Sequence, residues 1–249
     1  MCGIAGFIGE SKNPEITFQI INSLFKHLEV RGKDAAGFWG TQAGDGKTLY
    51  HKEPGRPSVF IKKPVWQEVE KLNPNLLIVH ARESSPGVGH PSNNINNHPF
   101  VSSDLNIGLI HNGRIPQYVY DELVKQYQVR SGCDSELLLR IFESGELYDE
   151  QDFETEFSNE DTSLASRLMG LRDIWSNAFR AHMAVAIGER LKNGRRLWVF
   201  RNDARSLWSV DLRDILGQIF FVSTPEIWQA AIFDSHEVRK FLSTTKIPK

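Results

Sequence analysis

The chain has 249 residues, of which 40% are hydrophobic and 24% charged, as in ordinary globular proteins. Its formal net charge of −2 excludes a general binder of polyanions, so no nucleic-acid partner is expected. The longest apolar runs have four or five residues, far fewer than the roughly 18 of a membrane helix, and no membrane contact is expected. The two cysteines, Cys2 and Cys133, provide no disulfide framework, and the first residues lack the pattern of a secretion signal. We therefore expect a cytoplasmic protein.

Short β-rich segments predominate along the chain and alternate with amphipathic helices. Strands are predicted at residues 3–8, 38–39, 59–61, 76–80, 100–103, 107–111, 183–187, 197–201, 206–212 and 219–223. Helices are predicted at residues 16–28, after Pro116, at 134–143 and from about 164 to 175. Several strands are apolar at consecutive positions, which indicates burial on both faces. The predicted fold class is α+β, with sheets covered by helices on their outer faces.

One segment differs from the rest in composition. Residues 146–162 contain eight acidic residues and neither Lys nor Arg. A run of this kind is typical of a solvated or disordered surface insertion. The alternative is a docking surface for a basic partner, which Phe153 and Phe157, four residues apart, would anchor.

The first residues suggest nucleophilic chemistry. Cys2 directly follows the initiator methionine, and removal of Met1 would leave Cys2 with a free α-amine. A thiol of ordinary pKa, about 8.5, must lose its proton before it can attack, and an α-amine of pKa about 7.7–8.0 can accept that proton. One residue then supplies both nucleophile and base. The alternative is that Cys2 is a small buried hydrophobe at the start of a strand.

Five short sequence blocks stand out along the chain. The blocks are Met1-Cys2-Gly3-Ile4-Ala5-Gly6, Arg31-Gly32-Lys33-Asp34-Ala35-Ala36-Gly37, His80-Ala81-Arg82 through Gly87, His111-Asn112-Gly113 and Ser131-Gly132-Cys133-Asp134-Ser135-Glu136. In their order and spacing they resemble the class II glutamine amidotransferases, the N-terminal-nucleophile family of the glutaminase domains of glucosamine-6-phosphate synthase and glutamine phosphoribosylpyrophosphate amidotransferase. The resemblance implies one glutaminase domain over residues 2–249, folded as a four-layer αββα sandwich of the N-terminal-nucleophile hydrolase type, with residues 146–162 as an insertion.

The resemblance also implies roles for individual residues. Attack on the side-chain amide of glutamine creates an oxyanion, which needs hydrogen-bond donors already in place. Asn112 and Gly113 match the pair that forms this oxyanion hole in the family, and the alternative for them is an Asn-Gly hairpin turn. By the same resemblance Arg82 holds the α-carboxylate of glutamine and Ser85 adds a hydroxyl. Asp134 holds the α-ammonium, and its place before a helix is also that of an N-cap; the two roles are compatible.

Supporting residues come from the same blocks. Arg31, Gly32 and Asp34 resemble the loop that frames the nucleophile, in a structural or a catalytic capacity. His80 and His111 are interpreted as hydrogen-bonding residues beside the site, as is His98, because the sequence shows no metal-ligand spacing. No metal and no cofactor are therefore expected.

The predicted reaction is hydrolysis of glutamine to glutamate and ammonia, with a thioester on Cys2 as intermediate. Family members carry an acceptor domain after the glutaminase domain; 249 residues leave no room for one, so a separate acceptor (synthase) subunit is expected. The block after Arg82 reads Glu83-Ser84-Ser85-Pro86-Gly87, where the family commonly has Trp-Ala-Thr-His-Gly, and Ala36 replaces a frequent Ser. Two alternatives follow. They are an amide hydrolase for another γ-glutamyl compound and a catalytically silent binding or regulatory module with the same fold, the latter favoured if Met1 is retained.

Overall fold

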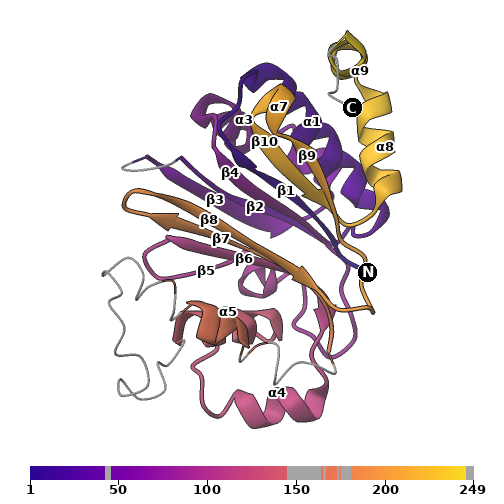
Figure 1. The fold of residues 1–249 in the computed structure, drawn as a ribbon. Coiled ribbons are helices and arrows are strands. Elements are labelled where there is room, and N and C mark those ends of the chain that lie inside the picture. Colours follow the sequence, from indigo (N-terminus) through magenta and orange to yellow (C-terminus); the bar gives the residue numbers. More distant parts are fainter. Residues whose placement is uncertain (43–45, 145–163, 165–166, 173, 175–180, 245–249) are drawn as a thin grey trace.

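Two antiparallel β-sheets form the centre of the computed structural model, which describes residues 1–42, 46–144, 164, 167–172, 174 and 181–244. Sheet A has the spatial order β3 (Thr48–Pro54), β2 (Ala35–Thr41), β4 (Leu76–Arg82), β1 (Gly3–Gly9), β10 (Gln218–Val222) and β9 (Trp208–Leu212). Sheet B has the order β5 (Phe100–Val101), β6 (Ile107–Arg114), β7 (His182–Leu191) and β8 (Gly194–Arg201). The two sheets lie face to face (Figure 1).

Helices cover the outer faces of both sheets. The helices of the described residues are α1 (Pro14–His27), η1 (Leu28–Val30), α2 (Pro57–Phe60), α3 (Pro64–Leu72), η2 (Asn94–Asn96), α4 (Gln117–Leu123), α5 (Ser135–Ser144), α7 (Arg213–Leu216), α8 (Pro225–Asp234) and α9 (His236–Thr244). Figure 1 shows α1, α3 and α8 beyond sheet A, and α4 and α5 beyond sheet B. The order of layers is therefore helix, sheet, sheet, helix, and the predicted αββα sandwich is confirmed.

Three hydrophobic cores correspond to the three interfaces between these four layers. One core packs α1, α3 and α8 on sheet A, and a second packs α5 on sheet B. The third lies between the sheets and contains Ile4 of β1, Ile78 of β4 and Ile110 of β6, all with no exposed surface. Strands with a core on each side must be apolar at consecutive positions, and β1, β2 and β4 have this pattern.

Trp39 sets the distance between the two sheets. It projects from β2 of sheet A, is fully buried and lies against Gly108 of β6 and Gly188 of β7 in sheet B. A Cβ atom at Gly108 would lie 2.5 Å from Cγ of Trp39, and a Cβ at Gly188 would overlap the six-membered ring. The indole ring therefore occupies space that only glycine leaves free on the facing strands.

One predicted strand is wrong. Residues 59–61 were expected to be extended because they read Val-Phe-Ile, but residues 57–60 form α2. Pro57 and Phe60, three positions apart, are buried, whereas Val59 is 53% exposed. That spacing is helical, and a proline is well tolerated in the first turn of a helix.

Other differences concern elements that the sequence pattern did not reveal and segments outside the description. Strand β3 and helices α3, α8 and α9 were not predicted. The described residues of the expected helix after Ser163 are helical, at 164, 167–172 and 174. The acidic segment 146–162, with Phe153 and Phe157, lies outside the described residues.

Among the described residues, no helix combines the length and apolar composition that crossing a membrane requires.

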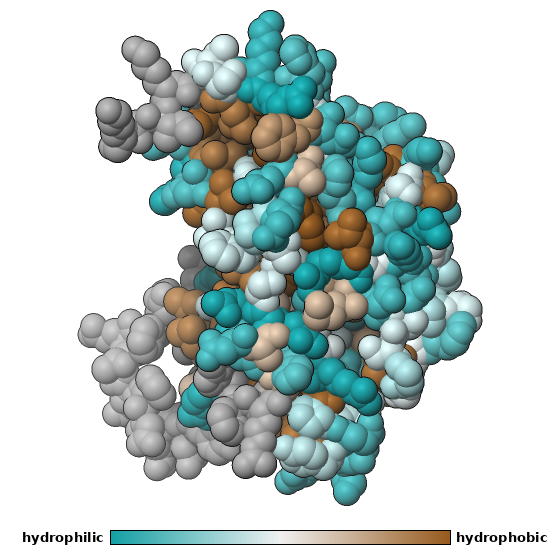
Figure 2. Space-filling view, turned by 90° about the vertical axis from the view of Figure 1, so that its right-hand side faces the viewer, coloured by the Kyte–Doolittle hydropathy of each residue, from teal (hydrophilic) through white to brown (hydrophobic). Residues whose placement is uncertain are grey.

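The surface next to the N-terminus is mostly hydrophilic. In Figure 2, apolar side chains gather in the upper part of this face, where α8 and α9 lie. Helix α8 buries Ile227 and Ala231 against sheet A, while Phe233 on its other side is 67% exposed.

We expect Gly188→Ala to reduce the free energy of unfolding by about 1–3 kcal/mol, because the added methyl group overlaps the ring of Trp39. Urea unfolding followed by tryptophan fluorescence measures the loss. Gly194→Ala on the neighbouring strand is the matched control, since a Cβ there has nothing within 4 Å. Equal stabilities of the two variants would contradict the assigned packing.

Candidate active site

The inward-facing rows of both sheets continue past the inter-sheet core at the same end of the sandwich. Side chains two residues apart on a strand share a face. The row of β1 therefore continues from Ile4 to Cys2, and the row of β6 continues from Ile110 to Asn112. A thiol from sheet A and a carboxamide from sheet B are thereby brought to one place.

The neighbouring strands contribute in the same way. The row of β4 continues from Ile78 through His80 to Arg82, and the row of β7 continues from Ala184 back to His182. Polar residues on these rows follow directly on apolar ones, so the site is the polar continuation of a hydrophobic core.

A cavity of about 280 Å³ lies at this end of the sandwich. This volume is close to the lower end of the range for small-molecule sites. Eight residues proposed from the sequence line it: Cys2, Arg82, Ser85, His98, His111, Asn112, Gly113 and Asp134. Arg31, Gly32, Asp34 and His80 do not line this cavity but lie behind or beside its wall.

Asn112 and Gly113 are strand residues. They pair with Ala184 and Met183 of β7, so the alternative of a hairpin turn is excluded. Asn112 is 1% exposed, and among the described residues nothing accepts a hydrogen bond from its Nδ2. A Cβ at Gly113 would overlap the carbonyl oxygen of His182, so this position needs glycine. The pair thus offers an unused amide donor and close backbone access to the cavity.

Asp134 directly precedes α5 and is 8% exposed. Its Oδ2 accepts a hydrogen bond of 2.7 Å from the backbone N–H of Ile115, after the end of β6. Its Oδ1 contacts the side chains of Cys133 at 3.8 Å and Ser135 at 3.4 Å. Within the described part of the chain, the carboxylate is thus bonded to Ile115 rather than to the first-turn amides of α5, so the N-cap alternative is not the arrangement found.

Cys2 lies beside the backbone, with Sγ 3.6 Å from the carbonyl oxygen of Glu83. Burial raises the pKa of its thiol above the ordinary value, although the Glu83 contact and the positive N-terminus act in the opposite direction. Arg31 holds the same residue from behind, since its Nε donates to the carbonyl oxygen of Cys2 at 2.9 Å. The thiol is therefore well positioned but protonated at neutral pH.

The two other residues of the framing block fix the adjacent loop. Asp34 accepts hydrogen bonds from the backbone N–H of Ser84 at 2.7 Å and from its hydroxyl group. A Cβ at Gly32 would lie 2.5 Å from the carbonyl oxygen of Ala81, so the chain at Gly32 lies directly against β4. Both contacts hold the segment that leads from β4 past Cys2.

Three buried histidines lie next to the cavity. Nε2 of His80 donates to the carbonyl oxygen of His111 at 3.1 Å, and the His80 ring stacks on that of His98 with ring centroids 3.9 Å apart. Burial lowers the pKa of His80 to about 3 and those of His98 and His111 below their usual range. All three rings are therefore neutral at pH 7. His80 and His111 form hydrogen bonds as expected, whereas neither ring nitrogen of His98 has a partner among the described residues.

Arg82 is 2% exposed and anchors the loop that follows β4. Its Nη1 donates to Oδ1 of Asn97 at 2.7 Å, and its Nη2 donates to the carbonyl oxygens of Val88 at 3.2 Å and Gly89 at 2.5 Å. The loop from Arg82 to Val88 includes Ser85, which lines the cavity.

Several cavity residues were not proposed from the sequence. They are Val88, Arg114, His182 and Arg205, together with Met1, Glu83, Cys133 and Ser135, which stand in blocks already singled out. Ser135 binds Nδ1 of His111 at 2.9 Å. Alternation of side chains along β7 is the sequence signal that could have located His182. Arg205 lies on the loop between β8 and β9, where no such alternation exists.

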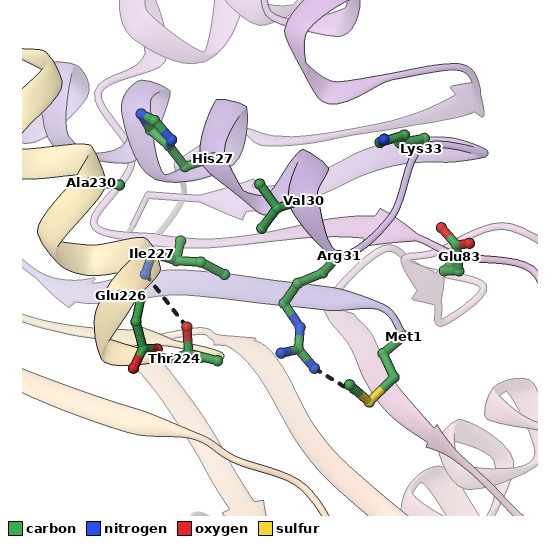
Figure 3. Close-up of a pocket in the computed structure, with 10 residues that line it drawn as sticks. All are labelled: Met1, His27, Val30, Arg31, Lys33, Glu83, Thr224, Glu226, Ile227 and Ala230. Carbon is green, nitrogen blue, oxygen red and sulfur yellow. Dashed lines mark hydrogen bonds between the residues drawn. The ribbon is translucent and has the colours of Figure 1, made fainter.

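A second, more open hollow adjoins the first. Figure 3 shows its lining from α1, η1, the segment after η1 and the start of α8, with the side chains of Arg31 and Met1 pointing toward each other. Its volume is about 640 Å³, and both Met1 and Glu83 line it as well as the smaller cavity. Met1, which is 64% exposed, therefore belongs to the boundary between the two.

Parts of the sequence are similar to known proteins. No model of a protein family matches the sequence. Over 158 residues the chain is 37% identical to glutamine–fructose-6-phosphate aminotransferase [isomerizing] of Thermococcus kodakarensis, a match that covers 62% of this chain and 24% of that protein. Its counterpart in Bacillus anthracis is 38% identical over 150 residues, covering 57% of this chain and 22% of that protein. The chain thus spans about a quarter of the length of these curated relatives.

Solved structures show the same fold. The allosteric regulatory enzyme of purine biosynthesis superimposes with a TM-score of 0.58 and 20% identity over 92% of this chain and 43% of its own. Glutamine phosphoribosylpyrophosphate amidotransferase from B. subtilis gives a TM-score of 0.55 with the same identity and coverage. These similarities support a class II glutamine amidotransferase domain. Within the described part of this domain, no group of three or more His, Cys, Asp or Glu side chains is arranged to hold a metal ion.

While Met1 is attached, we expect Cys2 to react slowly with iodoacetamide at pH 7 and faster as the pH rises. The reason is that burial raises the pKa of its thiol, so that less thiolate is present at pH 7 than in an ordinary cysteine. Intact mass spectrometry follows the rate against pH. Cys133, whose pKa burial raises to about 12, serves as the internal control and should stay unlabelled. Rapid labelling of Cys2 at pH 7 in the Met1-bearing chain would contradict the buried, protonated thiol.

Proposed function

We propose that this domain hydrolyses glutamine, with Cys2 as the nucleophile after removal of Met1. The observation that carries the proposal is the convergence of Cys2, Asn112 and Asp134 on one cavity from two sheets and a helix start. The three groups correspond to what amide hydrolysis of an amino acid needs: a nucleophile, an oxyanion donor and an anchor for an ammonium group.

Removal of Met1 supplies the missing base. The thiol of Cys2 has a raised pKa, and the neighbouring histidines are neutral but buried and engaged in the wall. A free α-amine on Cys2 has an ordinary pKa of about 7.7–8.0 and lies on the same residue as the thiol. It accepts the thiol proton as Sγ attacks the side-chain carbonyl carbon of glutamine.

The next steps follow from the same groups. The carbonyl oxygen becomes negative in the tetrahedral intermediate, where Nδ2 of Asn112 and the backbone N–H of Gly113 are the proposed donors. The carbon–nitrogen bond breaks, and the protonated α-amine returns its proton to the departing ammonia. Water then attacks the γ-glutamyl thioester, which releases glutamate and regenerates the thiol.

Asp134 is proposed to hold the α-ammonium of glutamine. Its Oδ2 is bonded to Ile115, whereas its Oδ1 has only the long contacts to Cys133 and Ser135 and borders the cavity. Because the backbone bond fixes the carboxylate, one oxygen remains oriented for the substrate.

We further propose that the ammonia serves an amination outside this domain. The support is that the similar proteins are glutamine–fructose-6-phosphate aminotransferases, whose name pairs glutamine with a sugar phosphate as the amino acceptor. We propose only the chemical class of the acceptor, which is a carbonyl or activated carbon that ammonia can attack. The acceptor site can lie on the same chain or on another.

The Met1-free protein is expected to release ammonia from glutamine, and Cys2→Ala should lower the rate by at least about 10⁴-fold, since the thioester can no longer form. Ammonia and glutamate are measured on samples whose N-terminus has been verified by intact mass. Cys2→Ala is processed at the same bond, so the two proteins differ in one sulfur atom only.

The two alternatives give distinct results in the same assay. Faster ammonia release from other γ-glutamyl amides than from glutamine would indicate a different substrate. Retention of Met1 with no activity on any amide would indicate a binding module and end the proposal.

Asn112→Ala is expected to lower kcat by about 10²–10³-fold with little change in KM, because its Nδ2 acts on charge that develops only in the transition state. Steady-state kinetics on glutamine provide both constants. A rise in KM at unchanged kcat would instead place Asn112 in ground-state binding.

A further inference from the structure

The proposed mechanism fixes where the departing nitrogen of a substrate lies. The α-nitrogen of Cys2 serves as the base and later returns its proton to the departing nitrogen, so the two nitrogens must come within hydrogen-bond distance of each other. Before processing, the same α-nitrogen is bonded to Met1. A substituent on the departing nitrogen would therefore begin in the space that Met1 occupies until it is removed.

That space leads out of the cavity at the end away from Asp134. Asp134 and Ser135 line the cavity from the start of α5, whereas Met1 and Glu83 line both the cavity and the larger hollow of about 640 Å³. A glutamine whose α-ammonium is held by Asp134 has its side-chain nitrogen at the end that adjoins this hollow. Once Met1 is removed, the hollow continues the site on the leaving side, and its volume is in the range of small-molecule sites.

The lining of the larger hollow combines a cation with apolar side chains. Arg31 is half-buried, and its Nε donates to the carbonyl oxygen of Cys2 at 2.9 Å, while its Nη2 donates to the sulfur of Met1 at 3.9 Å. Within the described ranges no carboxylate lies at ion-pair distance from Arg31. In Figure 3, Val30 and Ile227 lie on the side of Arg31 away from Met1. Removal of Met1 thus leaves Nη2 of Arg31 without this contact, beside apolar surface.

An α-amino acid has the groups that this lining can bind. As a leaving group it presents a carboxylate and a side chain on the carbon next to the departing nitrogen. The carboxylate suits Arg31, because a guanidinium donates strong hydrogen bonds to carboxylates and this one is only partly solvated. Glu83 and Glu226 also line the hollow, but both are exposed, so water screens their charges more effectively.

We propose that the domain also hydrolyses γ-glutamyl amino acids, with the departing amino acid in the larger hollow and its carboxylate bound by Nη2 of Arg31. This inference rests on the proposed mechanism at Cys2. Sγ attacks the δ-carbonyl carbon, the bond from that carbon to the nitrogen of the amino acid breaks, and the protonated α-amine of Cys2 gives its proton to that nitrogen. Water then hydrolyses the thioester, so the products are glutamate and the free amino acid.

Two matched substrates test this activity in the Met1-free protein. They are γ-glutamyl-2-aminobutanoate and γ-glutamylpropylamide, which is the same molecule without the carboxylate of the leaving group. The first should be cleaved with a kcat/KM within about 10-fold of that for glutamine and at least about 10-fold above that for the propylamide. Glutamate release from the three substrates is measured on samples whose N-terminus has been verified by intact mass.

Val30→Trp tests the place of the leaving group, because an indole there takes up space in the hollow. The variant should lower kcat/KM for γ-glutamyl-2-aminobutanoate by at least about 10-fold and change that for glutamine by less than about 2-fold. Val59→Trp is the matched control. Val59 is also an exposed valine, but it lies on α2 and lines neither the cavity nor the hollow, so both substrates should be cleaved as before.

Arg31→Met tests the carboxylate contact. All rates should fall, because Arg31 also holds the backbone of Cys2, but the preference for γ-glutamyl-2-aminobutanoate over the propylamide should fall as well, to less than about 2-fold. If Arg31→Met has no measurable activity, Arg31→Lys provides the comparison. Its single ammonium cannot make the Nε and Nη2 contacts together, so the preference should again be reduced.

Three results would overturn the proposal. They are a kcat/KM for γ-glutamyl-2-aminobutanoate more than about 10-fold below that for glutamine, equal effects of Val30→Trp on the two substrates, and an unchanged preference in the Arg31 variants. Activity of each variant on glutamine shows that it has folded. If the parent protein releases glutamate from none of the substrates, the failure lies with the proposed function and not with the assignment of the larger hollow.

Discussion

The spacing between the two sheets is the constraint on which the site depends. Trp39 of sheet A packs against Gly108 and Gly188 on the facing strands of sheet B. This contact determines how closely the two sheets approach each other. Cys2 comes from sheet A and Asn112 from sheet B, so neither sheet alone contains the site. A change of an ångström in sheet separation would alter the distance between nucleophile and oxyanion donor directly, and catalysis is sensitive to displacements of that size.

Burial is the second property that unites the site. The environment that makes the histidines neutral also raises the pKa of the thiol, because each effect is the cost of placing charge away from water. The same environment strengthens any hydrogen bond to a developing oxyanion. The site is thus suited to stabilise charge that forms during the reaction and unsuited to hold charge beforehand.

Much of the fold could be predicted because strands buried on both faces produce consecutive apolar residues, as in β1, β4 and β7. Residues 59–61 show the limit of this signal, since three apolar residues do not distinguish a strand from one buried turn of helix. Local motifs located Cys2, Asn112 and Asp134. The hydrogen bonds of Arg82 could not be predicted, because its partners Val88 and Gly89 depend on how the loop after β4 closes. The place of Arg205 at the cavity could not be predicted either, because Arg205 lies on the connection from β8 in sheet B to β9 in sheet A.

Met1 controls the proposed chemistry of the domain. It lies at the boundary of the two cavities and, on the proposed mechanism, holds the α-nitrogen of Cys2, the proposed base, in an amide bond. On that mechanism the protein that carries Met1 is inactive, and cleavage of one peptide bond activates it. Any extension joined ahead of Cys2, whether natural or added for purification, would leave the α-nitrogen of Cys2 in an amide bond. The protein would then fold but remain inactive on this mechanism.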